Sequence, residues 1–186
     1  VEDVSVVSGD NTALIQLQDL DRDGERETAV TFFRVSEAEK PLKIYFFTRT
    51  AEDTYTVSAM VEGNGTAIYR VDYVDLNGSG CKEVVVSWQM STGVYLLEAY
   101  SLEEAMVRSL QYAASAPAGS ATAQGLPDRE ALRATEWMTT VYDDYALYDL
   151  DQDTRTELAV VRVDKAGTNS AVDLYGWRDG SFMVRA

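Results

Sequence analysis

The chain has 186 residues, 46% of them hydrophobic and 10% aromatic, so it can bury a sizeable core as one large or two small domains. It carries 31 acidic and 16 basic residues, a formal net charge of −15, which argues against nucleic acid as a partner because nucleic acid binding requires clustered Lys and Arg. The lack of histidine excludes His-based catalytic triads and zinc sites, and the single cysteine excludes an intrachain disulfide.

The first unit is predicted to contain four short strands, after an apolar stretch at residues 4–7 that could be a strand paired with another unit. These four strands are predicted at residues 13–18, 28–35, 42–48 and 55–61. Turn residues separate them about every eight to twelve positions, a spacing typical of a sandwich or of a propeller blade.

The second unit repeats this scheme with strands predicted at residues 67–74, 82–90 and 94–102. Residues 67–74 alternate apolar with polar side chains, as a half-buried strand does. Residues 82–90 are nearly all apolar, which indicates a strand covered on both faces. Residues 105–113 fit a helix and a fourth strand equally well.

An insertion separates the second unit from the third. Residues 115–125 contain no large apolar side chain and are typical of a flexible loop, and a short helix through residue 134 can follow. The third unit then has strands predicted at residues 142–148, 157–163, 171–177 and 182–184.

We therefore predict an all-β fold of three tandem four-stranded antiparallel blades in a partial or open propeller-like array. The blades are expected at about residues 12–62, 66–113 and 135–186, with the Ala/Ser-rich insertion at about 114–134. Propellers close with about four or more blades, so we expect a fragment of a longer protein or an open array. In both cases further blades or oligomeric contacts would cover the open ends.

Each unit carries the same nine-residue acidic loop between its first two strands. We name these loop one (residues 19–27), loop two (75–83) and loop three (149–157). Oxygen-bearing side chains stand at positions 1, 3, 5 and 9 of each loop, and these positions hold ten of the 31 acidic residues. Calcium takes six to eight oxygen ligands, and a loop that alternates ligands with other residues can wrap such an ion.

These loops are not EF-hands, although loop one matches the first half of that pattern. An EF-hand takes a bidentate Glu from position 12 and continues as a helix. Position 12 is Val30, Val86 or Val160 here, and the residues around it are β-branched and apolar, as in a strand.

The pattern D-x-[DN]-x-[DS]-G-x-x-E between two strands resembles the calcium loops of FG-GAP repeats, also called VCBS repeats. These repeats occur in the propellers of integrin α-subunits and in many bacterial surface proteins. The resemblance covers all three units and implies calcium as the cofactor, held by the side chains at positions 1, 3, 5 and 9 and the carbonyl at position 7. The implied ligands are Asp19, Asp21, Asp23, Glu25 and Glu27 in loop one, Asp75, Asn77, Ser79, Cys81 and Glu83 in loop two, and Asp149, Asp151, Asp153, Arg155 and Glu157 in loop three.

The loops depart from the family pattern in three ways. All have Glu rather than Asp at position 9, loop two has Ser79 at position 5, and loop three has Thr154 where Gly usually makes the turn. Gly is used there because it accepts a positive φ without a Cβ clash. The alternative is that the loops are Asx-turn hairpins without metal, since Asp, Asn and Gly are common turn residues. Three loops in register favour metal, most strongly in loop one.

The sequence shows no catalytic motif, because no phosphate-binding Gly-rich loop, nucleophile elbow or His base is present. The turns at residues 36–41, 89–93 and 164–169 are expected to share the rim opposite the acidic loops. Trp88 and Gln89 are candidate ligand-binding residues on that rim, although Trp is more often a core residue.

We expect a non-catalytic, calcium-stabilised binding or scaffold module of a bacterial, lipoprotein-like surface protein, with a protein or glycan ligand. The alternative is an accessory fragment of a larger secreted polysaccharide-active enzyme. No run of about 18 apolar residues predicts a membrane span. The chain opens on Val1, so we expect a trimmed product whose targeting segment was removed and whose home is extracellular.

Overall fold

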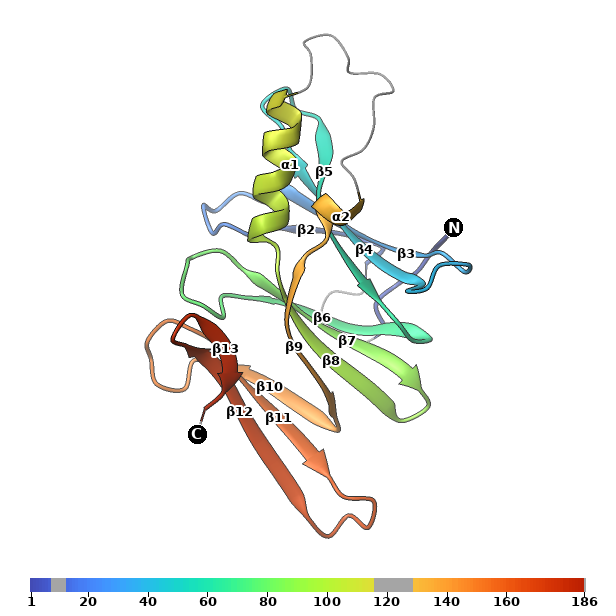
Figure 1. Ribbon diagram of the computed structural model, residues 1–186, viewed down its shortest axis with the longest axis vertical. Helices are drawn as coiled ribbons and strands as arrows, with labels where there is room; N and C mark the ends of the chain where they lie inside the picture. Colours follow the sequence, from blue (N-terminus) through green and yellow to red (C-terminus); the bar gives the residue numbers. More distant parts are fainter. Residues whose placement is uncertain (8–12, 116–128, 186) are drawn as a thin grey trace.

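The computed structural model describes residues 1–7, 13–115 and 129–185 of the chain. Its strands form three antiparallel sheets that follow one another along the long axis of the molecule (Figure 1). This arrangement confirms the predicted all-β class with three antiparallel units. None of the helices in the described part of the chain is long and apolar enough to span a bilayer.

The first sheet has the strand order β3-β4-β5, with β2 and the short β1 one after the other along the free edge of β3. These strands are β1 (Glu2–Asp3), β2 (Ile15–Gln18), β3 (Thr28–Arg34), β4 (Leu42–Arg49) and β5 (Tyr55–Gly63). The apolar residues after β1 reach the second sheet, because the Val7 amide donates a 3.0 Å hydrogen bond to the Ile68 carbonyl. Residues 4–7 do not form the expected strand, and the short strand β1 that precedes them pairs with β3 of its own sheet rather than with another unit.

The second sheet contains a strand that was not predicted, at residues that were assigned to the third unit. Its order is β6 (Ala67–Val74), β7 (Glu83–Ser91), β8 (Val94–Ser101) and β9 (Thr135–Tyr142). The third blade was expected to begin at about residue 135, yet β9 pairs with β8 from Ser101↔Thr135 to Tyr95↔Tyr142. Pairing with β8 buries Met138 and Tyr142 of β9 in the core between the second and third sheets.

The inserted segment interrupts the second sheet rather than following it. It contains α1 (Glu103–Ser115) and α2 (Arg129–Leu132), and residues 105–113 are therefore helical. Glu103 and Glu104 occupy the first turn of α1, where the helix dipole favours negative charge. Helix α1 lies beside β5 of the first sheet (Figure 1). The predicted flexible loop at 115–125 falls almost wholly outside the described residues.

The third sheet is a four-stranded meander that ends the described chain. Its strands are β10 (Asp144–Tyr148), β11 (Glu157–Val163), β12 (Ser170–Arg178) and β13 (Ser181–Val184), paired in that order. The sheet follows directly from β9, since only Asp143 separates β9 from β10.

The second sheet forms the middle layer, so both faces of β7 are buried. Val84, Val86 and Trp88 pack toward the first sheet. Val85, between them in sequence, packs toward the third sheet with Leu97 of β8. All five side chains are 0% exposed, which confirms the strand with two covered faces that the apolar run predicted.

Candidate metal sites

The three acidic loops share one backbone conformation. Positions 4 and 6 have a positive φ in every loop, between 61° and 95°, at Arg22 and Gly24, Gly78 and Gly80, and Gln152 and Thr154. Thr154 therefore takes the conformation that Gly takes in the other two loops, with φ 75°. The missing Gly of loop three strains the turn but does not change its path.

One hydrogen bond recurs in all three loops and folds the first side chain inward. The amide at position 6 donates to the carboxylate at position 1, from Gly24 to Asp19 (3.1 Å), from Gly80 to Asp75 (3.0 Å) and from Thr154 to Asp149 (3.0 Å). A second recurring bond runs from the amide at position 7 to the side chain at position 5. These bonds are the Asx-type contacts that the metal-free alternative also predicts.

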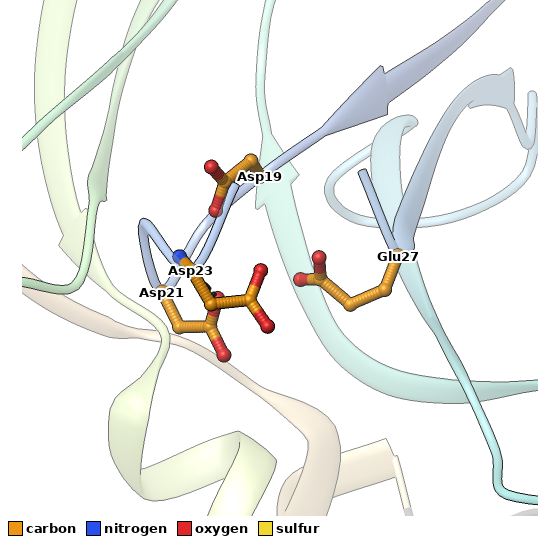
Figure 2. A group of neighbouring side chains, drawn as sticks. All are labelled: Asp19, Asp21, Asp23 and Glu27. Atoms are coloured by element: carbon orange, nitrogen blue, oxygen red, sulfur yellow. Dashed lines mark hydrogen bonds between the residues drawn. The ribbon is translucent and has the colours of Figure 1, made fainter. Parts of the chain in front are cut away.

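Loop one brings four carboxylates together. One oxygen from each of Asp19, Asp21, Asp23 and Glu27 lies within 4.8 Å of the others. Figure 2 shows Glu27 reaching across from the start of β3 toward the three aspartates of the loop. Glu25 lies outside this group, since its carboxylate pairs with Arg49 at 2.8 Å. Only the Glu25 carbonyl had been expected as a ligand.

Two oxygens of this cluster are buried and have no hydrogen-bond partner. They are Asp19 Oδ1 and Glu27 Oε2. An unpaired buried carboxylate oxygen is costly, because it has lost water without gaining a donor or a cation. The residues of loop one therefore fit a hard cation such as Ca²⁺, whose preferred ligands are carboxylate oxygens.

Loop two satisfies most of its oxygens internally. Glu83 Oε2 accepts a 2.8 Å hydrogen bond from the Leu76 amide, and Asn77 Oδ1 accepts one of 2.7 Å from the Ser79 amide. Burial raises the pKa of Glu83 to about 7, and the Leu76 amide opposes that rise. Loop one also supplies a positive charge, since Arg22 Nη1 lies 3.5 Å from Asp75 Oδ2.

Loop three holds a guanidinium among its acids. One oxygen from each of Asp149, Asp151 and Asp153 lies within 4.8 Å of the others. Arg185 bridges this loop, with Nη2 2.8 Å from Asp151 Oδ2 and Nη1 2.8 Å from Glu157 Oε1. The other oxygen of Glu157 accepts the Leu150 amide at 2.8 Å. The negative charge of loop three is thus partly compensated from within the chain.

The loop pattern gave no signal for Arg185, which follows Glu157 by 28 residues. Arg155, expected to contribute only its carbonyl, has its guanidinium 3.8 Å from Asp153. Its side chain also packs on Gly78 of loop two, where an added Cβ would lie 2.9 Å from Arg155 Nε. Basic side chains that the motif does not specify therefore decide how much negative charge each loop retains.

The three loops lie next to one another in chain order, and a backbone hydrogen bond joins each later loop to the one before it. The Lys82 amide of loop two donates to the Leu20 carbonyl of loop one at 2.7 Å, and the Thr156 amide of loop three donates to the Asp75 carbonyl of loop two at 2.8 Å. The Leu at position 2 is 4% exposed in loop one and 0% in loop two. Leu150 is 55% exposed, because no further sheet among the described residues packs beside loop three.

Trp88 is not a rim residue, which corrects the expected ligand-binding face. Its side chain is 0% exposed and packs on Gly63, where an added Cβ would lie 2.4 Å from the indole ring. Its Nε1 donates a 2.6 Å hydrogen bond to Glu98 Oε2. Trp88 lies on the same face of β7 as Val86, so strand alternation directs it into the core.

Gln89 is half-buried at the end of the same strand. Its carbonyl accepts hydrogen bonds from the Thr66 amide (2.7 Å) and from Thr66 Oγ1 (3.0 Å). These contacts join β7 to the turn before β6, and Trp88 and Gln89 do not form a common binding surface.

No model of a protein family matches the chain, and no curated protein matches it.

Proposed function

We propose that loop one binds Ca²⁺ and that the chain is a calcium-stabilised, non-catalytic binding or scaffold module that works outside the cell. The observation that carries the proposal is the loop-one cluster, whose four carboxylates converge and leave two buried oxygens unpaired. Asp19, Asp21, Asp23 and Glu27 would hold the ion, and the ion would supply charge compensation rather than chemistry. Extracellular modules bind calcium at about 0.1–1 mM, so such a loop would fill after secretion.

We propose weaker calcium binding for loops two and three. Loop two has only two carboxylates at its ligand positions, and Glu83 is committed to the Leu76 amide. Loop three has four carboxylates but already contains Arg185. The order of calcium affinity that follows is loop one first, with loops two and three weaker.

The proposal includes a partner on the outer face of the third sheet. Ala159 pairs with Leu174 on the face that points away from the second sheet, and Val172 on that face is 63% exposed. The equivalent pair in the second sheet, Val85 with Ala99, is fully buried against the third sheet. A further sheet of the same kind, from more of the array or from a second copy, would bury this face in the same way.

A calcium titration of stability tests the proposal. Binding to the native state alone adds about 2.7 kcal/mol at a hundredfold excess over Kd, which for a chain of this length raises Tm by about 5–10 °C. We expect such a rise between EDTA and about 2 mM Ca²⁺. Asp21→Ala should lose most of it, whereas Asp179→Ala, in the exposed β12–β13 turn, should keep it.

Two results would contradict the proposal. An equal Tm in EDTA and in calcium would show that loop one does not bind Ca²⁺. A calcium-dependent rise in Tm that is as large in Asp21→Ala as in the parent would show that the ion binds elsewhere. Turnover of any polysaccharide by the chain alone would contradict a non-catalytic role. For the partner, we expect Val172→Asp to weaken self-association in sedimentation velocity, and a parent that stays monomeric would rule out the second copy.

A further inference from the structure

A cavity of about 230 Å³ lies between α1, loop one and loop two. Its buried aliphatic lining includes Leu20 of loop one and Leu102 before α1, which are 4% and 3% exposed. Its outer lining includes Val107 and Leu110 of α1, which are 47% and 68% exposed although they are aliphatic. The cavity therefore continues onto an apolar strip of α1 that is exposed on the surface.

The charged lining of this cavity is mostly acidic. Asp21 and Glu27 of loop one and Glu103 of α1 line it, against one base, Lys82. Glu83 lines it too, but its carboxylate accepts the Leu76 amide. Glu27 Oε2 is buried without a hydrogen-bond partner, while Glu27 Oε1 accepts the Thr28 hydroxyl at 3.2 Å. An apolar space thus has the side chains of Asp21, Glu27 and Glu103 in its lining.

We propose that this cavity binds an aliphatic ammonium ion, with its alkyl chain among Leu102, Met106 and Leu110 and its charged nitrogen against the Glu27 carboxylate. The chain of such a ligand gains from leaving water for the aliphatic lining. The nitrogen offers N–H donors and a positive charge to a lining that is mostly acidic.

Charge complementarity favours an alkylammonium ion over a carboxylate or an alcohol of the same chain length. A fatty carboxylate of equal length would bring a negative charge beside Asp21, Glu27 and Glu103. A neutral alcohol would fill the apolar space but leave the charge of Glu27 uncompensated. The volume equals that of about seven or eight water molecules at about 30 Å³ each, which suits a short alkyl chain rather than a whole lipid tail.

The site goes beyond the calcium proposal and does not rest on it, but the two share residues. Asp21 and Glu27 line the cavity and also belong to the loop-one cluster. Calcium in loop one would neutralise the same carboxylates, so calcium and the ammonium ion should weaken each other's binding reciprocally. Asp23 belongs to the cluster but does not line the cavity, so Asp23→Asn separates the two effects.

Isothermal titration calorimetry with octylammonium chloride at pH 7 in EDTA tests the proposal, with sodium octanoate and octanol as length-matched probes. We expect octylammonium to bind at least tenfold more tightly than octanoate, with octanol between them. Leu110→Ser should weaken octylammonium binding at least threefold. Val141→Ser, at an exposed aliphatic residue of the second sheet, should leave it unchanged.

The single cysteine locates the bound probe. Cys81 lines the cavity and is exposed, so octylammonium should slow its alkylation by iodoacetamide, which is uncharged. Octanoate binding as tight as octylammonium, equal affinity in Leu110→Ser, or unprotected Cys81 would each overturn the proposal. If octylammonium binds the parent protein and calcium does not displace it, the result supports the cavity proposal and contradicts the calcium site in loop one. Displacement in the parent but not in Asp23→Asn supports both.

Discussion

Glu62 is the most sharply testable residue of the fold, because one buried carboxylate joins three basic side chains. It is 4% exposed on β5 and pairs with Lys43 of β4, which is 3% exposed. Arg129 and Arg133 reach the same carboxylate from the inserted segment, with Arg133 Nη2 2.9 Å from Glu62 Oε2. The Ala134 amide donates to the Met60 carbonyl at 2.9 Å. The Glu62 carboxylate and this backbone hydrogen bond therefore both hold the segment after α2 against β5.

Glu62→Gln keeps the shape of this side chain and removes its charge, which leaves Lys43 buried without an anion. Breaking a buried ion pair from one side costs about 3–5 kcal/mol, and we expect about 3 kcal/mol because the two arginines reach solvent. For a chain of this length that loss lowers Tm by about 6–12 °C. Glu130→Gln is the matched control, since Glu130 is exposed and pairs only with Arg133 at the surface.

The dependence on pH follows from the direction of the pKa shift. Burial alone would raise the pKa of Glu62, but hydrogen bonds from Lys43, Arg129 and Arg133 bring it below its ordinary value of 4.5. A group with a lowered folded pKa stabilises above its unfolded pKa and loses that contribution as pH falls through the folded value. The Tm gap between parent and Glu62→Gln should therefore be full at pH 7 and narrow below about pH 4.

The double variant Lys43→Met/Glu62→Gln decides whether the buried lysine causes the loss. If it does, the double variant is more stable than Glu62→Gln, because no unpaired ammonium remains in the interior. A Glu62→Gln variant within about 0.5 kcal/mol of the parent, the range of ordinary surface substitutions, would refute the reasoning. A pH-independent gap would refute it as well.

Three further substitutions test the loops and the core. Thr154→Gly should relieve about 1–2 kcal/mol of left-handed backbone strain in the folded state. The added glycine costs about 0.5–1 kcal/mol because it gives the unfolded chain more conformational freedom. Urea unfolding of the variant should therefore show a stability equal to or slightly above that of the parent, and a clear loss of stability would contradict the strain. Arg185→Ala should free Asp151 and Glu157, so a calcium titration should show tighter binding at loop three than in the parent. Unchanged binding would mean that Arg185 does not compete. Gly63→Ala should cost about 1–3 kcal/mol in thermal unfolding by overpacking against Trp88, and a neutral effect would show that the indole ring can shift.

The sequence was most informative where local chemistry decides the structure. Period-2 alternation and β-branched residues predicted the strands that flank each loop, and the apolar run of β7 predicted its two covered faces. The acidic spacing predicted the convergence in loop one. Each of these features depends on residues within one turn or one strand, which is the range over which sequence patterns specify geometry.

The errors came from contacts between distant segments. Strand β9 resembles any other half-buried strand, and nothing in its pattern states that it returns to β8 across the insertion. Trp88 was expected near a turn, but β7 continues to Ser91, and the contact with Gly63 of β5 places the indole ring in the core. Arg185 carries no motif, and its pairs with Asp151 and Glu157 join residues about 30 positions apart, which no local pattern specifies.

Loops of nearly equal backbone can differ in metal affinity because basic side chains reach them unequally. Loop one donates Arg22 to loop two and keeps two unpaired oxygens of its own. Loop three receives Arg185 from the end of the chain. A cation gains most where carboxylates repel one another without an internal counter-ion, since binding there relieves repulsion and displaces no existing pair. A calcium site should therefore be ranked by the arginines around it as well as by its ligand motif, and loop one leads on both counts.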